Sequence, residues 1–120
     1  CVRMTVVVEL YGLEIRGRHG AEPEEREREQ PFLYDVELEL PEPAGDRLEQ
    51  TVDYREVVEL VRELSGSRQF TLLETMATAV ADALLERFPA ERVRVRVRKP
   101  EVRLAAPAEH AAASVERSRS

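Results

Sequence analysis

The 120-residue chain is predicted to be an α+β domain, a four-stranded antiparallel sheet with two helices on one face, in the order strand, strand, helix, helix, strand, strand. Three observations lead to this fold class. Residues 32–40 and 92–98 alternate apolar and polar side chains with the period of two that a strand requires. Residues 53–64 and 71–88, which lie between them, carry apolar side chains with helical period. The length and a hydrophobic content of 42% fit one domain over residues 1–120 with one modest core.

The N-terminal third is expected to supply two strands joined by a loop. Residues 4–15 are rich in β-branched side chains, which favours a strand. Residues 16–31 hold two glycines, two prolines and a run of charges, which predicts a long polar loop. The second strand, residues 32–40, has one apolar face, made of Tyr34, Val36, Leu38 and Leu40.

The first helix is expected over residues 53–64. Asp53 is placed as its N-cap, and Glu56, three residues later, as the partner carboxylate. One apolar stripe is made of Val57, Val58, Leu60, Val61 and Leu64. Such a stripe predicts a helix that packs on the sheet.

The second helix is expected over residues 71–88, where Thr71 and Glu74 have the spacing of a capping box. Two strands follow, residues 92–98 and, with a weaker pattern, residues 111–117. They complete the predicted sheet.

The strand "RVRVRVR" divides its side chains sharply between two faces. Its valines should meet the helices, because two helices cover only one side of a four-stranded sheet. Its arginine face is then either open to solvent or the wall of a wet, enclosed space. The two outer strands would also leave unpaired edges, which favours assembly of several chains edge to edge.

Composition excludes several classes of function. A net charge of −6 with 35% charged residues disfavours nucleic acid as a general partner. There is no apolar run of 18 residues, so no membrane span is expected, and the N-terminal residues lack the pattern of a secretory signal. The single cysteine, Cys1, cannot form an internal disulfide, which fits a cytoplasmic protein.

Polar residues at the ends of the predicted elements are the remaining candidates for chemistry. No phosphate-binding glycine loop or zinc-ligand spacing is present, and the two histidines lie far apart, so neither a metal nor a cofactor is expected. Lys99 stands out because it is the only lysine among 18 lysines and arginines. The other candidates are His19, Glu22, Glu24, Glu25, Asp53, Tyr54 and Glu74.

Four short segments, "RGRHGAEPEE", "TVDY", "FTLLET" and "VRVRKP", resemble dihydroneopterin aldolase of folate biosynthesis in their order and spacing. The resemblance implies the tunnelling fold, in which subunits join edge to edge into a tetrameric barrel and two barrels stack into an octamer. It also implies a small-molecule pterin substrate bound between neighbouring subunits. The arginine face would then line the interior of the barrel.

The same resemblance assigns the pterin-binding residues. Glu74 would anchor the pterin by accepting two hydrogen bonds from the ring's amino group and the adjacent N–H. Leu72 and Leu73 would contact the ring through their backbone, and Tyr54 would reach the site from the neighbouring subunit. The alternatives are that Glu74 only completes a capping box and that Tyr54 is a half-buried aromatic residue at a helix start.

Lys99 corresponds to the catalytic lysine of the family, and Glu25 to the glutamate beside the substrate's side chain. The implied reaction is a retro-aldol cleavage that needs neither a metal nor a Schiff base. Arginine cannot exchange protons near neutral pH, whereas a lysine can when burial or nearby cations favour its neutral form. Arg96, Arg98 and Arg103 are the cations expected near it. The alternatives are a chance lysine, and for Glu25 a solvated run of acidic residues.

Two departures from the family pattern and two rival functions stay open. The usual aromatic residues before "HG" are replaced by Ile15, Arg16 and Arg18. The last strand contains "AAASVE" in place of the family's usual "VGVEI".

One rival function is that of an epimerase acting at C2′ of dihydroneopterin or its triphosphate on the same scaffold. The other is a barrel-forming protein that binds without catalysis.

Overall fold

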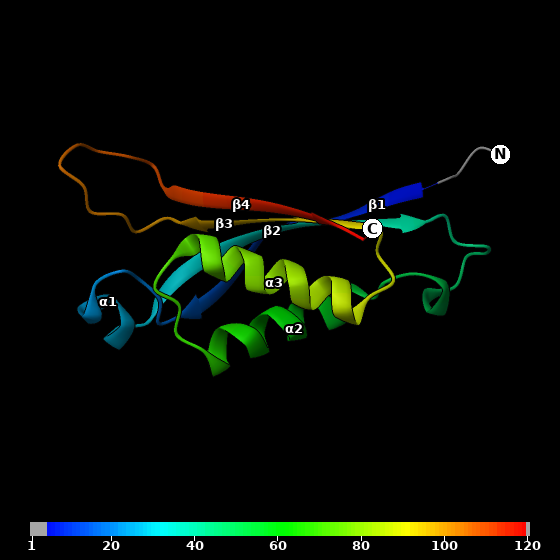
Figure 1. Ribbon diagram of the computed structural model, residues 1–120, viewed down its shortest axis with the longest axis horizontal. Helices are drawn as coiled ribbons and strands as arrows, with labels where there is room; N and C mark the ends of the chain where they lie inside the picture. Colours follow the sequence, from blue (N-terminus) through cyan, green and yellow to red (C-terminus); the bar gives the residue numbers. More distant parts are fainter. Residues whose placement is uncertain (1–4, 120) are drawn as a thin grey trace.

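The computed structural model describes residues 5–119, so Cys1 and Met4, the expected first residue of the first strand, lie outside the described residues. A twisted sheet carries two long helices on one face, and its other face is open (Figure 1). The elements in chain order are β1 (Thr5–Gly17), α1 (Pro23–Glu27), β2 (Gln30–Pro41), a short 3₁₀ helix (Leu48–Gln50), α2 (Tyr54–Ser67), α3 (Leu73–Arg87), β3 (Arg92–Lys99) and β4 (Ala111–Ser118).

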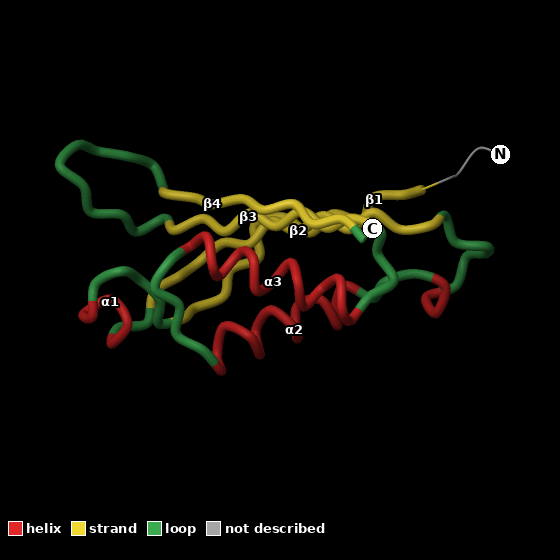
Figure 2. Tube along the Cα trace, viewed as in Figure 1, coloured by secondary structure: helices red, strands yellow, loops and turns green. Residues whose placement is uncertain are grey.

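The four strands are arranged in the order β1-β2-β3-β4, and every neighbouring pair is antiparallel (Figure 2). This confirms the predicted sheet and the order of its elements. β4 forms despite its run of alanines because each of its eight residues pairs with β3, from Ala111 opposite Lys99 to Ser118 opposite Arg92.

The alternation in the sequence places the core correctly. Tyr34 and Val36 of β2 and Val95 and Val97 of β3 are fully buried on the side of the helices. They pack with the apolar stripe of α2, where Val61 is fully buried, and with the buried residues of α3. The predicted apolar faces of both strands and of the first helix are therefore confirmed.

The predicted helix starts are right in one case and wrong in the other. Asp53 is the N-cap of α2, and its Oδ1 accepts the backbone N–H of Arg55 at 3.0 Å. Glu56 does not assist it, because its side chain accepts from Arg87 of α3 at 2.7 Å. α3 starts at Leu73 after an N-cap residue, Leu72, that makes no side-chain cap. The expected capping box of Thr71 with Glu74 is therefore wrong, and Glu74 is left available for another role.

Residues 16–31 are not one long loop. β1 continues to Gly17 and β2 starts at Gln30, and between them lies α1. This short helix has a proline in its first turn, and Glu22 and Glu25 form its capping box. The charge run therefore folds locally, and this ordering fixes the position of Glu25.

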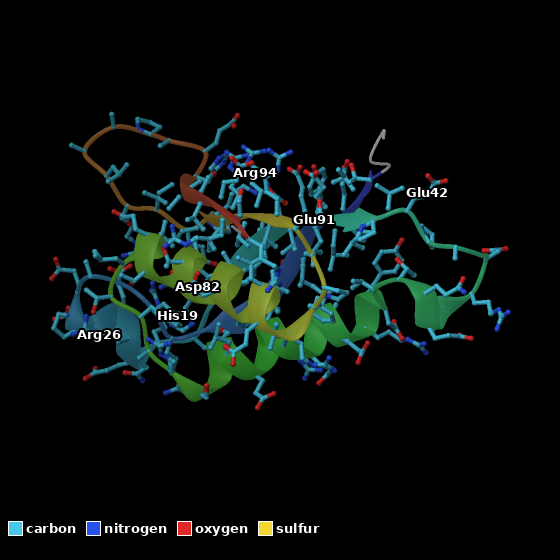
Figure 3. The ribbon with its side chains drawn as sticks, turned by 45° about the vertical axis from the view of Figure 1, so that its right-hand side comes forward. His19, Arg26, Glu42, Asp82, Glu91 and Arg94 are labelled. Carbon is cyan, nitrogen blue, oxygen red and sulfur yellow. The ribbon has the colours of Figure 1, made fainter. Side chains whose placement is uncertain are left out.

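Three of the four arginines on the open face of β3 form ion pairs within the sheet. Arg94 donates to Glu37 at 3.1 Å and Arg98 to Asp35 at 2.9 Å, and Arg92 pairs in the same way with an acidic residue of β2. In Figure 3, Arg94 lies on the side of the sheet away from α2 and α3. The two pairs with half-exposed arginines, those of Arg92 and Arg94, contribute only about 0–1 kcal/mol each. They match charge across the two strands more than they hold the fold together.

Candidate active site

A cavity of about 740 Å³ lies at the end of the molecule where α1, the start of α3 and the segment after β3 come together (Figure 1). Segments that are far apart in the sequence supply its walls. Five of the six predicted site residues line it: Glu25, Leu72, Leu73, Glu74 and Lys99. The structure thus gathers most of the predicted set into one place.

The alternation of β3 explains why Lys99 faces the cavity. Val95 and Val97 point toward the helices, and Lys99 is the next residue on that same side. Arg98 points to the opposite face, where it pairs with Asp35. The single lysine therefore continues the valine series and not the arginine series, at the position where the sheet's covered face opens into the cavity.

Lys99 and Glu25 form a direct ion pair within the cavity. The Nζ of Lys99 donates to Oε2 of Glu25, and the two side chains are only 16% and 23% exposed. The capping box of α1 orients Glu25, because its Oε1 also accepts the backbone N–H of Glu22 at 3.3 Å. The hydrogen bond from Lys99 holds the pKa of the Glu25 carboxyl below its usual range. A cation and a carboxylate in contact are suited to passing a proton to and from a bound molecule.

Glu74 lines the same cavity from a different element, the first turn of α3. Within the part of the chain that the structure describes, its carboxylate is exposed and has no hydrogen bond or ion pair. Leu72, 46% exposed, and the partly buried Leu73 lie beside it. The cavity thus has an unpaired carboxylate as well as the Lys99–Glu25 pair.

Tyr54 is the one predicted site residue that does not line the cavity. It is the first residue of α2, it is 57% exposed, and the other end of α2 leads toward the cavity. The 14 residues of α2 span about 21 Å at 1.5 Å per residue. A single chain therefore keeps Tyr54 away from its own cavity, and the expected role of Tyr54 requires a second chain.

The arginines expected to surround Lys99 are only partly present. Arg98 donates to Asp35, and Arg96 contacts the ring of His110 at 3.2 Å, so neither faces the lysine. Arg103 does line the cavity. The expectation of a cationic cluster is therefore wrong for two of the three arginines, because the alternation of β3 turns them to the other face.

His19 is central to the site in a way that its sequence position did not reveal. It is 2% exposed, lines the cavity, and packs between the rings of Phe32 and Phe70, whose centroids lie 5.2 and 5.4 Å from that of His19. Figure 3 labels His19 in the interior, near α1. Burial lowers the pKa of its imidazole. Gln30, also buried, donates from Nε2 to the backbone oxygen of His19. "HG" was recognisable as part of a motif, but the contacts of His19 depend on residues 11 to 51 positions away.

Comparisons with known proteins decide the family. The family model of dihydroneopterin aldolase (FolB) matches residues 8–116 of this chain. The chain belongs to the dihydroneopterin aldolase family. It is 36% identical to the dihydroneopterin aldolase of Methylorubrum extorquens, over 92% of this chain and 88% of that protein. It is 38% identical to that of Streptomyces coelicolor, over 93% of this chain and 97% of that protein.

Solved structures of the family agree with the fold. The Escherichia coli dihydroneopterin aldolase in complex with neopterin superposes with a TM-score of 0.81 at 26% identity, covering 94% of this chain and 99% of that one. The dihydroneopterin aldolase of Burkholderia thailandensis bound to guanine gives 0.79 at 26% identity, covering 97% and 93%. The resemblance predicted from four short motifs is therefore confirmed over nearly the whole domain.

No group of three or more His, Cys, Asp or Glu side chains between residues 5 and 119 is arranged to hold a metal ion. Among the helices of that same span, none is long and apolar enough to cross a membrane.

Proposed function

We propose that this protein is a dihydroneopterin aldolase of folate biosynthesis, acting in the cytoplasm. It would cleave 7,8-dihydroneopterin into 6-hydroxymethyl-7,8-dihydropterin and glycolaldehyde. The observation that carries the proposal is the family match over residues 8–116, together with the meeting of Lys99, Glu25 and Glu74 around one cavity. The relatives that bind neopterin and guanine support a pterin-like ring as the ligand.

In this proposal Glu74 recognises the pterin ring. Neopterin and guanine share a 2-amino-4-oxo ring edge, which presents an amino group next to a ring N–H. A carboxylate with no other partner accepts both donors in a paired, directional way. The unpaired Glu74 fits that edge, and the exposed backbone at Leu72 and Leu73 lies alongside it.

Lys99 and Glu25 act on the substrate's side chain. In the retro-aldol step a hydroxyl proton leaves, the adjacent carbon–carbon bond breaks, and its electron pair moves into the ring imine, which takes up a proton at nitrogen. A proton must then be added to the carbon that stays on the ring, while the ring nitrogen gives up the proton it had taken, so that the imine is restored. Lys99 and Glu25, in contact with each other, exchange these protons, and the ring serves as the electron sink.

The site is completed by a second subunit. Tyr54 projects from the far end of α2, and the cavity of the same chain is open toward solvent. Assembly of chains edge to edge, as expected for the unpaired outer edges of β1 and β4, would bring the Tyr54 of one chain to the cavity of its neighbour. A tetrameric ring or an octamer of two rings fits this arrangement.

The direct test is to incubate the purified protein with 7,8-dihydroneopterin and to identify the products by chromatography and mass spectrometry. Formation of 6-hydroxymethyl-7,8-dihydropterin with an equal amount of glycolaldehyde is expected. A product of unchanged mass but altered retention would identify the 2′-epimerase instead. Binding of neopterin without any conversion would leave a binding protein on the same scaffold.

A further inference from the structure

A neutral imidazole joins two segments that line the cavity, the one that leads to Glu25 and the one that leads to Glu74. The backbone N–H of Phe70 donates to Nδ1 of His19 at 3.0 Å, and Nε2 of His19 lies 3.0 Å from Oγ of Ser65. Because Nδ1 receives a hydrogen bond, it carries no proton. The proton is then on Nε2, which donates to Ser65.

Gly17 makes this arrangement possible. A Cβ atom at Gly17 would lie 2.5 Å from Nε2 of His19 and 2.7 Å from Oγ of Ser65. Any side chain there would displace one of the two hydrogen-bonding groups. A glycine at position 17 therefore leaves the room that the hydrogen bond between the imidazole of His19 and Ser65 of α2 requires.

The backbone on each side of His19 is tied to the same two segments. Gly20 donates from its backbone N–H to the carbonyl of Phe70 at 2.9 Å, in parallel with the imidazole contact. Glu25 packs directly on Gly20, since a Cβ there would lie 2.5 Å from the Cβ of Glu25. Four residues after Phe70 comes Glu74. His19 thus stands between the segment that ends in Glu25 and the segment that ends in Glu74.

We propose that His19 is a positioning residue that fixes the spacing between Glu74 and the Lys99–Glu25 pair, and so sets the affinity of the site for its ligand. The inference rests on the proposed function, because that spacing matters only for a ligand held at both ends. The functional group is the Nδ1 acceptor for the N–H of Phe70. The contact with Ser65 only holds the ring in the orientation that presents Nδ1.

Two substitutions separate the ends of the ring. In His19→Asn the amide oxygen can take the place of Nδ1 and keep the hydrogen bond from Phe70, while the contact with Ser65 is lost. In His19→Gln the longer amide reaches toward Ser65, and the N–H of Phe70 is left buried without its acceptor. Neither residue titrates. Comparing them tests the acceptor while the polarity of the site stays similar.

The measurements are neopterin affinity by calorimetry, kcat and KM, and a thermal melt of each variant. We expect His19→Asn to bind neopterin within about threefold of wild type, and His19→Gln to bind roughly tenfold or more weakly, on the scale of one unsatisfied buried donor. Equal affinities in the two variants would overturn the proposal. So would a lower melting temperature of His19→Gln with unchanged neopterin affinity and KM, because that result describes a purely structural residue.

A measurement on the unmodified protein covers the case in which a variant does not fold. Nitrogen-15 NMR of the wild type with neopterin should show Nδ1 of His19 unprotonated and the amide of Phe70 protected from exchange. A proton on Nδ1 would overturn the proposal. The proposed reaction can fail separately, because neopterin binding that depends on His19 in a protein without turnover would contradict only the aldolase step.

Discussion

The substitution Glu74→Gln tests the proposed role of Glu74 in binding separately from stability, because Glu74 does not cap α3. Glu74 is not part of a capping box, and its carboxylate forms no hydrogen bond or ion pair with any other described residue. Its only expected contribution to stability is a favourable charge in the first turn of α3, worth about 0.3–1 kcal/mol. The melting temperature of Glu74→Gln should therefore fall by about 1–8 °C at most, at roughly 4–8 °C per kcal/mol for a small domain.

The effect on binding should be much larger. A glutamine side chain offers one oxygen and one NH₂, so one of the two pterin donors would face another donor. Hydrogen bonds to a charged group contribute about 1.5–3 kcal/mol, which corresponds to roughly a tenfold to 150-fold loss of affinity. Neopterin affinity measured by calorimetry, with a thermal melt of the same sample, gives both quantities.

Glu101→Gln is the matched control. Glu101 also lines the cavity and is exposed, so its substitution removes one negative charge from the same space. We expect it to leave neopterin affinity within about threefold of wild type, since exposed charges interact weakly through water. If both variants weaken binding equally, the cavity's total charge is what matters. If Glu74→Gln binds as well as wild type, the pairing with the ring edge is refuted.

Three further predictions concern the rest of the site. Lys99→Arg keeps the charge beside Glu25 but cannot exchange protons, so turnover should fall roughly 10²–10⁴-fold while neopterin affinity, measured by calorimetry, stays close to wild type. Subunits of inactive Lys99→Arg and of Tyr54→Ala, unfolded and refolded together, should regain part of the activity if each site combines residues of two chains; mixtures as inactive as their components would contradict the shared site. Below pH 6.5, the ordinary pKa of histidine, the unfolded chain takes up a proton that the folded protein binds only at lower pH, because burial lowers the pKa of His19. The contribution of His19 to the free energy of unfolding should therefore be complete above pH 6.5 and be lost as the pH falls through its lower folded pKa. Urea titrations at several pH values should show this loss for the wild type and not for His19→Asn.

The sequence was sufficient for the sheet and its faces. Alternation correctly assigned the buried face of β3 and of β2 from Tyr34 to Leu40, because a side chain one position away points to the opposite face, but it left out the buried Gln30 and Phe32. The same local logic identified Asp53 as a cap. It failed for Thr71 and Glu74, which have the spacing of a capping box although the helix begins two residues later. A cap depends on where the chain enters the helix, and the entry to α3 is set by the contacts of Phe70 with His19 and Gly20.

The cavity could not be predicted from local patterns, because each of its walls is held by a contact between distant segments. α1 was missed because its five residues resemble a solvated charge run. Its ordering comes from one capping box and from Arg26, which donates to the carbonyl oxygens of Gly20 and Ala21. The motifs found Glu25 as a residue of the site, and only the fold shows that Lys99 is its partner.

The position of Lys99 shows how the fold separates the proposed catalytic lysine from the arginines of the same strand. In the sequence the lysine directly follows Arg98. In the strand, however, its side chain lies on the same face as the valines, one position beyond Val97 on that face. The arginines project to the face where β2 presents acidic residues, and ion pairs neutralise three of them, Arg92, Arg94 and Arg98. On the other face the core excludes water as far as Val97, and the next position opens into the cavity, where Glu25 is the charged partner. We expect an arginine at position 99 to keep that ion pair and the fold, so in the proposed mechanism the need for lysine comes from proton exchange.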